Sequence, residues 1–238
     1  MRTNDSKNNK LRKTLPRKKH IEPSTTHWVN AFKKIPCFLI GNGPSLIKVN
    51  TKLLENYFTI GINRCFLKID PSILMWQDLA LWVQEKKKVS KTEAIKYCRA
   101  GSDLNSGFYY FRLSGSNAKL PSHPNTLFGR GSSGSLAFQL AYILGCDPII
   151  LVGMDCRYSE SGLTNFYGKN PMHREHTLVF CKKALKWIRD EKHGRKIINC
   201  SKNKVFEERL TVEEVIEKNN IQPITRKEIN KILKNKDK

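Results

Sequence analysis

Two segments of this chain carry the residue types that bind a phosphate or a nucleotide. The first is the turn Gly41-Asn42-Gly43-Pro44-Ser45, which directly follows the short apolar run 37–40. The second is Ser132-Ser133-Gly134-Ser135, which precedes the apolar stretch LAFQLAYILG and should open a helix. Exposed backbone N–H groups and the positive end of a helix dipole both attract anions. Each segment is therefore a candidate anion-binding site.

The glycine turn matches neither of the common phosphate-binding patterns. Gly41-x-Gly43 resembles the start of a dinucleotide fingerprint, but the third glycine is missing, and no Gly-Lys-Ser/Thr sequence closes a Walker loop. A Gly-x-Gly turn is a structural bend about as often as it is a phosphate cradle. Asn42 favours the second interpretation, because its amide offers both a donor and an acceptor beside exposed backbone.

Three further polar residues follow apolar runs and are candidates for ligand binding: Asn63, Asp78 and Asp155. In a parallel sheet, ligands bind beyond the carboxyl ends of the strands, so residues at these positions meet at one edge. Asp78 and Asp155 are also the two carboxylates that could hold magnesium in a phosphoryl-transfer enzyme. No wider acidic cluster in the sequence predicts a metal centre.

His173 and His176 stand three residues apart at the start of a predicted helix. A metal site would need a third ligand, and Cys181 lies five residues beyond His176, which is not one helical turn. An imidazole titrates near neutral pH, so a general base is the better interpretation of one of the two histidines. A surface histidine near a helix terminus is the alternative.

The positions of these residues depend on an alternation of predicted strands and helices. Short apolar runs predict strands at 37–40, 57–61, 73–76, 94–98, 108–113, 148–153 and 196–200. Helices are expected at 45–56 with Ser45 as N-cap, at 132–145, at 173–190 and twice after residue 200, whereas 120–130 should be a loop. The alternation predicts a Rossmann-like α/β fold, in which helices cover both faces of a mostly parallel sheet.

Charge divides the chain into three parts. We expect a flexible basic arm at 1–25, a nucleotide-binding α/β domain at 26–210 and a charged helical tail at 211–238. The formal net charge is +22, from 43 Lys and Arg against 21 Asp and Glu, and much of it lies at the two ends. Such ends are typical of tails that contact nucleic acid or anionic membrane lipid, although a lysine- and asparagine-rich coding bias would produce the same excess.

Cysteine content and hydropathy narrow the class of protein. The seven cysteines are scattered and never spaced Cys-x-x-Cys, which predicts reduced, mostly buried thiols rather than zinc ligands or disulfides. Residues 1–20 lack the apolar core of a secretory signal, and no stretch approaches the roughly 18 apolar residues of a spanning helix. We therefore expect a cytoplasmic protein, at most peripheral to the inner membrane surface.

Five ordered pieces of the sequence, between about residues 36 and 206, resemble the DUF115 family. They are GNGPSL, GINR, the aspartate after ILMW, the block GRGSSGSLAFQLAYILGCDPIILVGMD and the later histidine-bearing helix. This family includes flagellin-modifying motility accessory factors and archaeal 6-hydroxymethylpterin diphosphokinases, and it is similar to the bacterial CMP-sialic-acid-dependent sialyltransferases. The resemblance implies a nucleotide-binding transferase.

The resemblance also implies which residues hold the nucleotide. The turn Gly41 to Ser45 matches the nucleotide-binding turn of the sialyltransferases. Asn63 matches an asparagine near the donor phosphate and sugar, and Ser132-Ser133-Gly134 matches the helix opening that lies against the nucleotide. The two candidate segments would then bind the same nucleotide.

The resemblance further implies catalytic roles for three residues. His176 precedes Ala184 by eight residues, as a sialyltransferase histidine precedes its Ala-Leu-aromatic helix, and His173 does not; this makes His176 the general base. Tyr158 and Tyr167 fall in the loop where the sialyltransferases place two tyrosines against the leaving phosphate, although the spacing differs here. Phenol donors and helix-end amides would neutralise that phosphate without a cation, so neither a metal nor a cofactor is expected.

The expected function is that of an inverting glycosyltransferase, which moves a sugar from a nucleotide donor, CMP-linked, to a glycan, lipid-linked or protein acceptor. The alternative is a 6-hydroxymethylpterin diphosphokinase, which would bind magnesium, or another nucleotide-dependent transferase. A third interpretation is a nucleic-acid-binding protein that uses its basic ends, and sugar transfer onto modified DNA bases would combine both. The donor sugar, the acceptor and the oligomeric state stay open.

Overall fold

The computed structural model describes residues 24–101, 107–115, 120–129, 131–168, 175–191 and 194–234. Its strands are β1 (Cys37–Ile40), β2 (Thr59–Ile62), β3 (Ile73–Trp76), β4 (Ile95–Arg99), β5 (Tyr109–Ser114), β6 (Thr126–Phe128), β7 (Ile149–Val152) and β8 (Ile197–Asn199). Its helices are α2 (Thr51–Leu54), α3 (Leu79–Lys91), α4 (Ser133–Ile143), α5 (Glu175–Glu191), α6 (Val212–Lys218) and α7 (Arg226–Lys234), with the short 3-10 helices η1 (Thr26–Trp28), η2 (Pro44–Lys48) and η3 (Asn63–Leu67).

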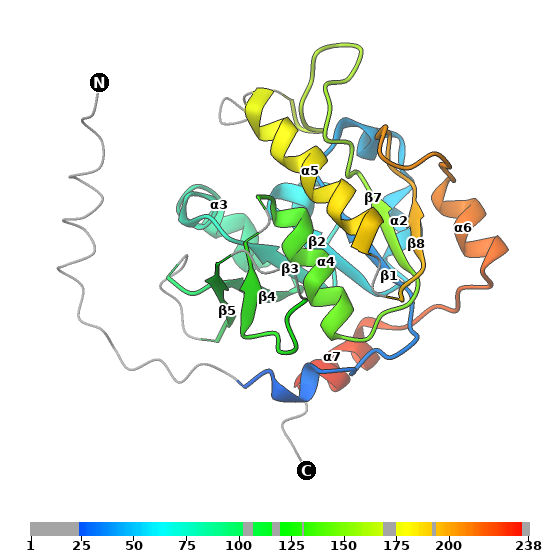
Figure 1. Cartoon of the computed structure of the whole chain (residues 1–238). Coiled ribbons are helices and arrows are strands. Elements are labelled where there is room, and N and C mark those ends of the chain that lie inside the picture. Colours follow the sequence, from blue (N-terminus) through cyan, green and yellow to red (C-terminus); the bar gives the residue numbers. More distant parts are fainter. Residues whose placement is uncertain are drawn as a thin grey trace, which may run out of the picture.

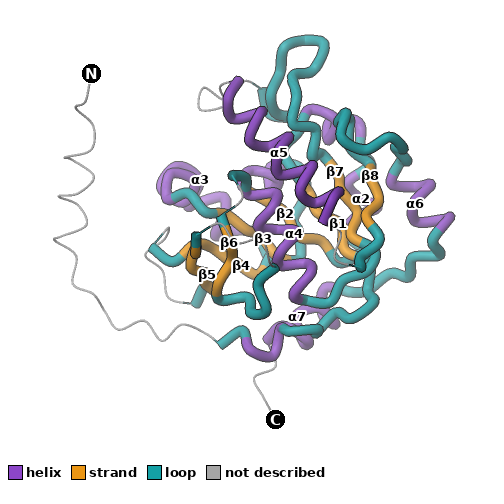
Figure 2. Tube along the Cα trace, in the orientation of Figure 1, coloured by secondary structure: helices purple, strands orange, loops and turns teal. Residues whose placement is uncertain are grey.

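The described residues form one sheet of eight strands in the order β6-β5-β4-β3-β2-β1-β7-β8. Each neighbouring pair of strands is parallel. Helices surround the sheet, as the ribbon in Figure 1 and the tube in Figure 2 show. The predicted Rossmann-like α/β fold is therefore confirmed.

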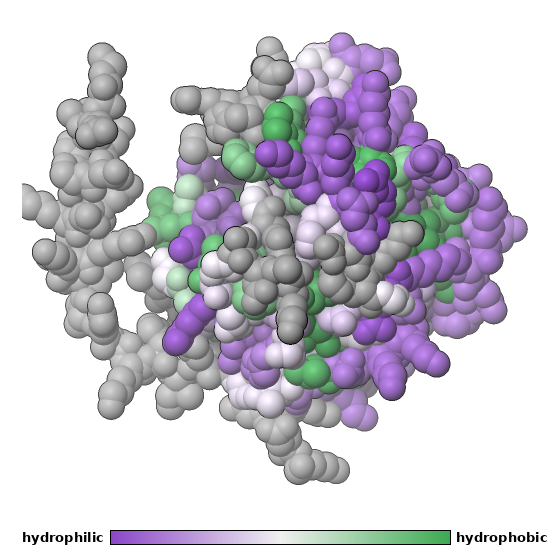
Figure 3. Space-filling model, in the orientation of Figure 1, coloured by the Kyte–Doolittle hydropathy of each residue, from purple (hydrophilic) through white to green (hydrophobic). Residues whose placement is uncertain are grey.

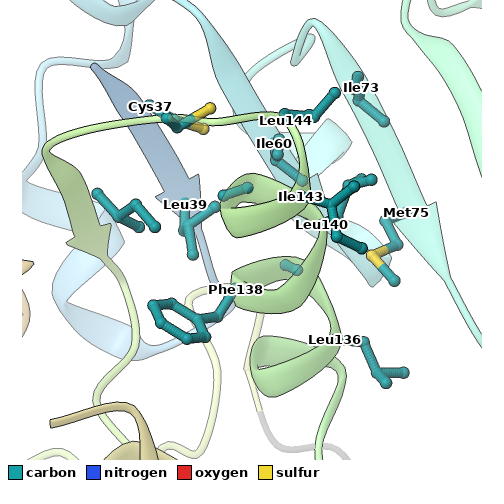
Figure 4. Packing of buried hydrophobic residues seen from close by; sticks show 14 of the residues in the cluster. Cys37, Leu39, Ile60, Ile73, Met75, Leu136, Phe138, Leu140, Ile143 and Leu144 are labelled. Carbon is teal, nitrogen blue, oxygen red and sulfur yellow. The ribbon is translucent and has the colours of Figure 1, made fainter. Parts of the chain in front are cut away.

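The central strands are buried on both faces, because their apolar side chains alternate between two clusters. Leu39 of β1 belongs to the first cluster, together with buried residues of α4, α5 and α7. Phe38 and Ile40 belong to the second, together with buried residues of α2, α3 and α6. Figure 4 shows α4 lying over the sheet in the first cluster, where it presents Leu136, Phe138, Leu140 and Ile143. Continuous apolar strands are what such a two-sided sheet requires.

The chain winds in two directions from β1. It proceeds from β1 to β6 on one side, and α4 then returns it to β7 on the other side of β1. After β1 the chain enters η2 and α2, which pack in the second cluster, whereas after β7 it enters α5, which packs in the first. The loops that follow these adjacent strands therefore diverge. In open α/β sheets such a point leaves a crevice beyond the carboxyl ends of the strands, where ligands bind.

Two segments differ from the predicted secondary structure at the level of whole elements. The prediction of a loop at 120–130 is wrong for Thr126–Phe128, which form β6 at the edge of the sheet. A strand this short, between Pro124 and Gly129, leaves no periodic signal. Helix α3 has no counterpart in the prediction, because its buried residues Leu81, Trp82 and Val89 are interrupted by a run of lysines.

The predicted helix at 45–56 is broken into η2 and α2, because Val49 between them adopts an extended conformation (φ −80°, ψ 131°). The prediction that Ser45 caps this helix is also wrong. Gly43 holds the N-cap position, and the Ser45 hydroxyl instead donates a hydrogen bond to Asp155. The Ser45 side chain, which the sequence pattern predicts as a helix cap, thus binds a residue of the loop after β7 instead.

The two short helices expected near the C-terminal end are present as α6 and α7. Val215 of α6 and Leu233 of α7 are fully buried, one in each cluster. The indole Nε1 of Trp28 donates to the Leu233 carbonyl oxygen at 3.0 Å, which joins η1 to α7. The two helices therefore complete the core at separate places: α7 lies at the lower end of the molecule in Figure 1, and α6 lies at its right-hand side.

The surface and the thiols fit the composition. The seven cysteines are free, and five of them are buried, as the sequence predicts. Figure 3 shows hydrophilic residues over most of the described surface in that view. None of the described helices is long and apolar enough to cross a bilayer. Residues 1–23, most of the predicted basic arm, lie outside the described residues.

Candidate functional site

The turn after β1 lies directly against the loop after β7. The backbone N–H groups of Gly41 and Gly43 donate to the carbonyl oxygens of Val152 and Gly153, both at 2.7 Å. A Cβ atom on Gly41 would stand 2.3 Å from the Gly153 carbonyl oxygen, which is closer than any real contact. Both glycines are therefore needed for the approach of two backbones. Their N–H groups are also used inside the protein and are not free for a phosphate.

Asp155 holds three loops together at this edge. Its carboxylate accepts hydrogen bonds from the Ser45 backbone N–H at 2.7 Å, the Ser45 hydroxyl at 2.6 Å and the Lys202 backbone N–H at 2.9 Å. The residue is 3% exposed. Such bonds to a carboxylate are stronger than bonds between neutral groups, and here they join the segments after β1, β7 and β8. The nucleotide-binding role predicted for Asp155 stays a prediction, and its oxygens are already engaged.

Asn42 connects the glycine turn to the end of β2. Its side-chain Nδ2 donates to the Ile62 carbonyl oxygen at 3.0 Å. Its backbone carbonyl oxygen accepts from the Phe166 N–H at 2.9 Å. Its Oδ1 is buried and has no hydrogen-bond partner among the described residues. A bound water, an ion or a functional role are among the explanations for an unsatisfied buried polar atom in a native protein. The side chain is thus oriented by the protein and left with one free acceptor.

The N-terminus of α4 meets the ends of β2 and β3. Asn63 Nδ2 lies 3.4 Å and Gln77 Nε2 lies 3.1 Å from the hydroxyl oxygen of Ser133, the first residue of α4. Ser132 is the N-cap, and its side chain accepts from the Ser135 N–H. Asn63 has a left-handed φ of 50°, a conformation that asparagine tolerates better than most residues. The helix opening predicted at 132–135 is therefore confirmed.

These contacts bring the two predicted segments to one place. Asn42 is bonded to Ile62, the next residue is Asn63, and Asn63 reaches Ser133. Gly134 also fits closely here, since a Cβ at that position would stand 3.0 Å from the sulfur of Met154. The result is a cluster of uncharged amide and hydroxyl groups in front of α4, which we call the amide cluster: Asn42, Asn63, Gln77 and Ser133.

Gln77 joins this cluster where its neighbour Asp78 does not. Asp78 is exposed at the N-cap of α3 and makes no side-chain capping bond. The alternation of side chains along β3 decides this, because adjacent residues at the end of a strand point in opposite directions. The sequence predicts a role for Asp78 because a carboxylate can bind a ligand or a metal. The alternation of side chains along β3 is the signal that could have identified Gln77 instead.

The two predicted tyrosines lie on different sides of the glycine turn. Tyr158 is 42% exposed and lines a pocket beside Ser45 and Lys48. Tyr167 lies beside Asn63's neighbour Arg64, whose Cζ is 5.7 Å from the centre of the phenol ring. Tyr167 therefore contacts the residue that follows Asn63, whereas Tyr158 lines the pocket beside η2.

Arg64 is itself fixed by α3. Its Nε lies 3.1 Å from a carboxylate oxygen of Glu85, and Lys88 approaches the other oxygen at 3.2 Å. Burial alone would raise the pKa of Glu85, but hydrogen bonds from Arg64 and Lys88 outweigh burial and lower it. A charged pair thus holds the guanidinium next to Tyr167.

Neither histidine of the predicted pair can be placed. His173 lies outside the described residues, and His176 is described only as a backbone position in the first turn of α5. Its role as general base stays a prediction.

A shared magnesium site at Asp78 and Asp155 is not favoured by the topology. Strands β3 and β7, which these residues follow, are three positions apart in the sheet, roughly 14 Å at ordinary strand spacing. Within the part of the chain that the structure describes, no group of three or more His, Cys, Asp or Glu side chains could hold a metal ion.

Two thiols behind the loop after β7 form a pair that sequence spacing does not reveal. Cys156 follows Asp155, and its thiol is hydrogen-bonded to Cys181 of α5. This bond, together with burial, raises the pKa of Cys156 well above its ordinary value. The same bond lowers the pKa of Cys181, although burial acts in the opposite direction.

Two pockets of the described surface differ in what lines them. One of about 340 Å³ lies beside β8, near Lys196 and Lys218, and contains none of the predicted site residues. The other, of about 290 Å³, is lined by four predicted site residues: Pro44, Ser45, Asp155 and Tyr158. The second pocket is therefore the one connected with the candidate site.

Comparison with known proteins gives a weak likeness to glycosyltransferases. No family model matches the chain, and no curated protein matches it in sequence. The structure resembles that of the MAf glycosyltransferase from Magnetospirillum magneticum AMB-1 with a TM-score of 0.46 and 13% identity, over 90% of this chain and 44% of that one. This chain thus spans less than half of that enzyme's length.

A second likeness is to the sialyltransferase CstII from Campylobacter jejuni. In complex with the substrate analogue CMP-3FNeuAc it matches with a TM-score of 0.40 and 15% identity, and in complex with cytidine-5'-monophosphate with 0.41 and 14%. Each match covers 70% of this chain and 80% of CstII. Likenesses this distant carry no argument about activity, and the resemblance to the DUF115 family is not confirmed by a family model.

Proposed function

We propose that this protein is an inverting glycosyltransferase that moves a sugar from a CMP-linked donor to an acceptor hydroxyl. The observation that supports the proposal is the amide cluster, in which Asn42, Asn63 and Ser133 meet at the carboxyl edge of the sheet in front of the first turn of α4. Crevices at this position are where α/β proteins bind nucleotides. Free N–H groups of a helix N-terminus favour a phosphate there.

The transfer would form one bond and break one. The acceptor oxygen attacks the anomeric carbon of the donor sugar while His176 takes the proton of the acceptor hydroxyl. The bond between the anomeric carbon and the phosphate oxygen breaks, and CMP leaves with the bonding electrons. The phenol of Tyr167 and the first N–H groups of α4 would stabilise the charge that develops on the phosphate.

The topology favours this reaction over magnesium-dependent phosphoryl transfer. A diphosphokinase needs carboxylates that hold magnesium against the phosphates. Asp78 and Asp155 follow strands that are three positions apart, and the Asp155 oxygens already accept three hydrogen bonds. An uncharged cluster suits transfer without a metal.

The test is thermal unfolding of the full chain with CMP, UMP, GDP, ADP or ATP, each with and without magnesium. A ligand that binds only the folded state raises the melting temperature, by an amount that follows its concentration relative to Kd. We expect CMP to give the largest shift and magnesium to leave it unchanged. A shift with ATP that requires magnesium would contradict the proposal and favour the diphosphokinase.

His176→Ala should abolish sugar transfer and leave the CMP-induced shift nearly unchanged, because a general base acts on the acceptor and not on the nucleotide. His123→Ala is the matched control, since it removes an imidazole from a loop before β6, away from the carboxyl edge. Full transfer activity in His176→Ala would remove this residue from the mechanism.

A further inference from the structure

The pocket of about 290 Å³ beside η2 is formed by loops that are distant in sequence. Its walls come from η2, from the loop after β7 and from the segment after β8. In Figure 1 these are the blue, yellow-green and orange segments gathered at the upper right of the molecule. Asp155 fixes their relative positions through its bonds to Ser45 and Lys202. These hydrogen bonds therefore fix the walls of the pocket relative to one another.

Four cationic side chains line this pocket: Lys48, Arg157, Lys202 and Arg209. None of them forms an ion pair with a residue of the described ranges. Two carboxylates line it as well: that of Asp155, which is buried and already accepts three hydrogen bonds from neutral donors, and that of exposed Glu160. Positive side chains therefore outnumber negative ones on these walls, and an anionic ligand would reduce the repulsion among the cations.

The composition of the pocket favours a phosphate group as the anion. Arginine guanidinium groups bind phosphate oxygens in pairs, and lysine ammonium groups bind them as point charges. The exposed phenol of Tyr158 and the hydroxyls of Ser159 and Ser161 add neutral donors to the same walls. The volume lies near the lower limit of known small-ligand pockets, so the guest is about the size of a phosphorylated monosaccharide.

The pocket is separate from the amide cluster. None of Asn42, Asn63 and Ser133 lines it. The helix η2 packs in the second hydrophobic cluster, whereas α4 packs in the first, so the glycine turn stands between the pocket and the start of α4. The two places are nevertheless connected along the chain, since Pro44 and Ser45 of the pocket wall follow Asn42 by two and three residues.

We propose that this pocket binds a phosphate ester carried by the acceptor substrate, while the nucleotide donor occupies the amide cluster. The acceptor part of this inference rests on the proposed function. Glucose 6-phosphate and a short prenyl phosphate share the required chemistry and represent a soluble and a lipid-linked acceptor respectively.

The experiment is isothermal titration of the full chain at constant salt with glucose 6-phosphate, geranyl phosphate and glucose. We expect one or both phosphate esters to bind and glucose not to bind. Lys48→Gln and Arg209→Gln should each weaken binding about tenfold, since each removes a charged donor. Both side chains are exposed, so the variants should fold, and unchanged melting temperatures without ligand would verify this.

The matched control is Lys204→Gln, which removes one exposed positive charge close to Lys202 but outside the pocket. Equal weakening by the control would show that the phosphate ester responds to net charge alone, and would overturn the proposal. Absence of binding, or competition between CMP and the phosphate ester, would also overturn it. A parallel titration with CMP is a separate measurement: failure of CMP to bind would contradict the proposed function and leave the result for the pocket readable.

Discussion

The two sides of the glycine turn present different kinds of polar group. Towards α4 lie amides and a hydroxyl that are oriented by hydrogen bonds, with Asn42 and Ser133 buried. Towards η2 lie exposed cations such as Lys48 and Arg209. Buried neutral groups give direction and fit, whereas exposed cations give attraction that salt screens. The difference teaches that a net charge of +22 does not by itself locate the site for chemistry.

The largest expected effect comes from a substitution in the glycine turn, which lies between the two sides. In Gly41→Ala the new Cβ would stand 2.3 Å from the Gly153 carbonyl oxygen, so backbone must move. We expect a loss of about 3 kcal/mol in the free energy of unfolding. The melting temperature should fall by roughly 6–12 °C, measured by calorimetry.

Gly115→Ala is the control for this substitution, because a Cβ at Gly115 meets no atom within 4 Å. Gly41→Ala should also weaken binding of both CMP and the phosphate ester. If the variant retained wild-type stability, the close packing of the loops after β1 and β7 would not be what Gly41 provides.

A smaller effect, confined to one side, is expected from Ser133→Ala. The substitution removes the acceptor shared by Asn63 and Gln77 and leaves both amides without their partner. Affinity for CMP should fall about tenfold, whereas binding of a phosphate ester in the cationic pocket should not change. Titration calorimetry with both ligands measures this.

Ser161→Ala removes a hydroxyl from the cationic pocket. It should weaken binding of the phosphate ester and leave the affinity for CMP unchanged. Equal losses of both ligands in Ser133→Ala would mean that the two sides form one site, and the comparison above would fail.

The smallest effect concerns the pair that holds Arg64 beside Tyr167. The pKa of Glu85 is lowered in the folded protein, so its stabilisation is present above the unfolded pKa and is lost as pH falls through the folded value. Glu85→Gln should cost at most about 0.5 kcal/mol at neutral pH, because solvent screens the pair. Urea unfolding should show that the difference in free energy of unfolding between wild type and Glu85→Gln is smaller at acid pH than at neutral pH.

Glu55→Gln, at an exposed glutamate without an ion pair in the described residues, should show no such dependence. A difference between wild type and Glu85→Gln that persisted at acid pH would contradict an electrostatic role for Glu85.

The sheet was largely accessible from the sequence, because strands buried on both faces appear as continuous apolar runs such as Cys37–Ile40 and Ile149–Val152. The exceptions have physical reasons. Thr126–Phe128 is too short to show a pattern, and the lysine run in α3 hides its apolar face. Ser45 looks like a helix cap in one dimension, yet Asp155, far along the chain, binds it.

The amide cluster was also partly predictable, since the ends of parallel strands share one edge. That rule brings Asn42, Asn63 and Ser133 together, as their contacts show. It does not reveal that the N–H groups of Gly41 and Gly43 bond to the last residue of β7 and to the residue after it, because this depends on how β1 and β7 align. The four cations of the second pocket come from η2 and from the segments after β7 and β8, and no sequence spacing could have linked them.

The contact between Trp28 and Leu233 has a consequence for how the molecule can be handled. It lies with α7 at the amino-terminal edge of the sheet, where Arg226 also reaches the Pro71 carbonyl oxygen just before β3. Both flanks of the fold therefore emerge on the side away from the polar loops. A molecule attached to a support near residue 24 or residue 234 would therefore keep the loops at the carboxyl edge of the sheet facing the solvent.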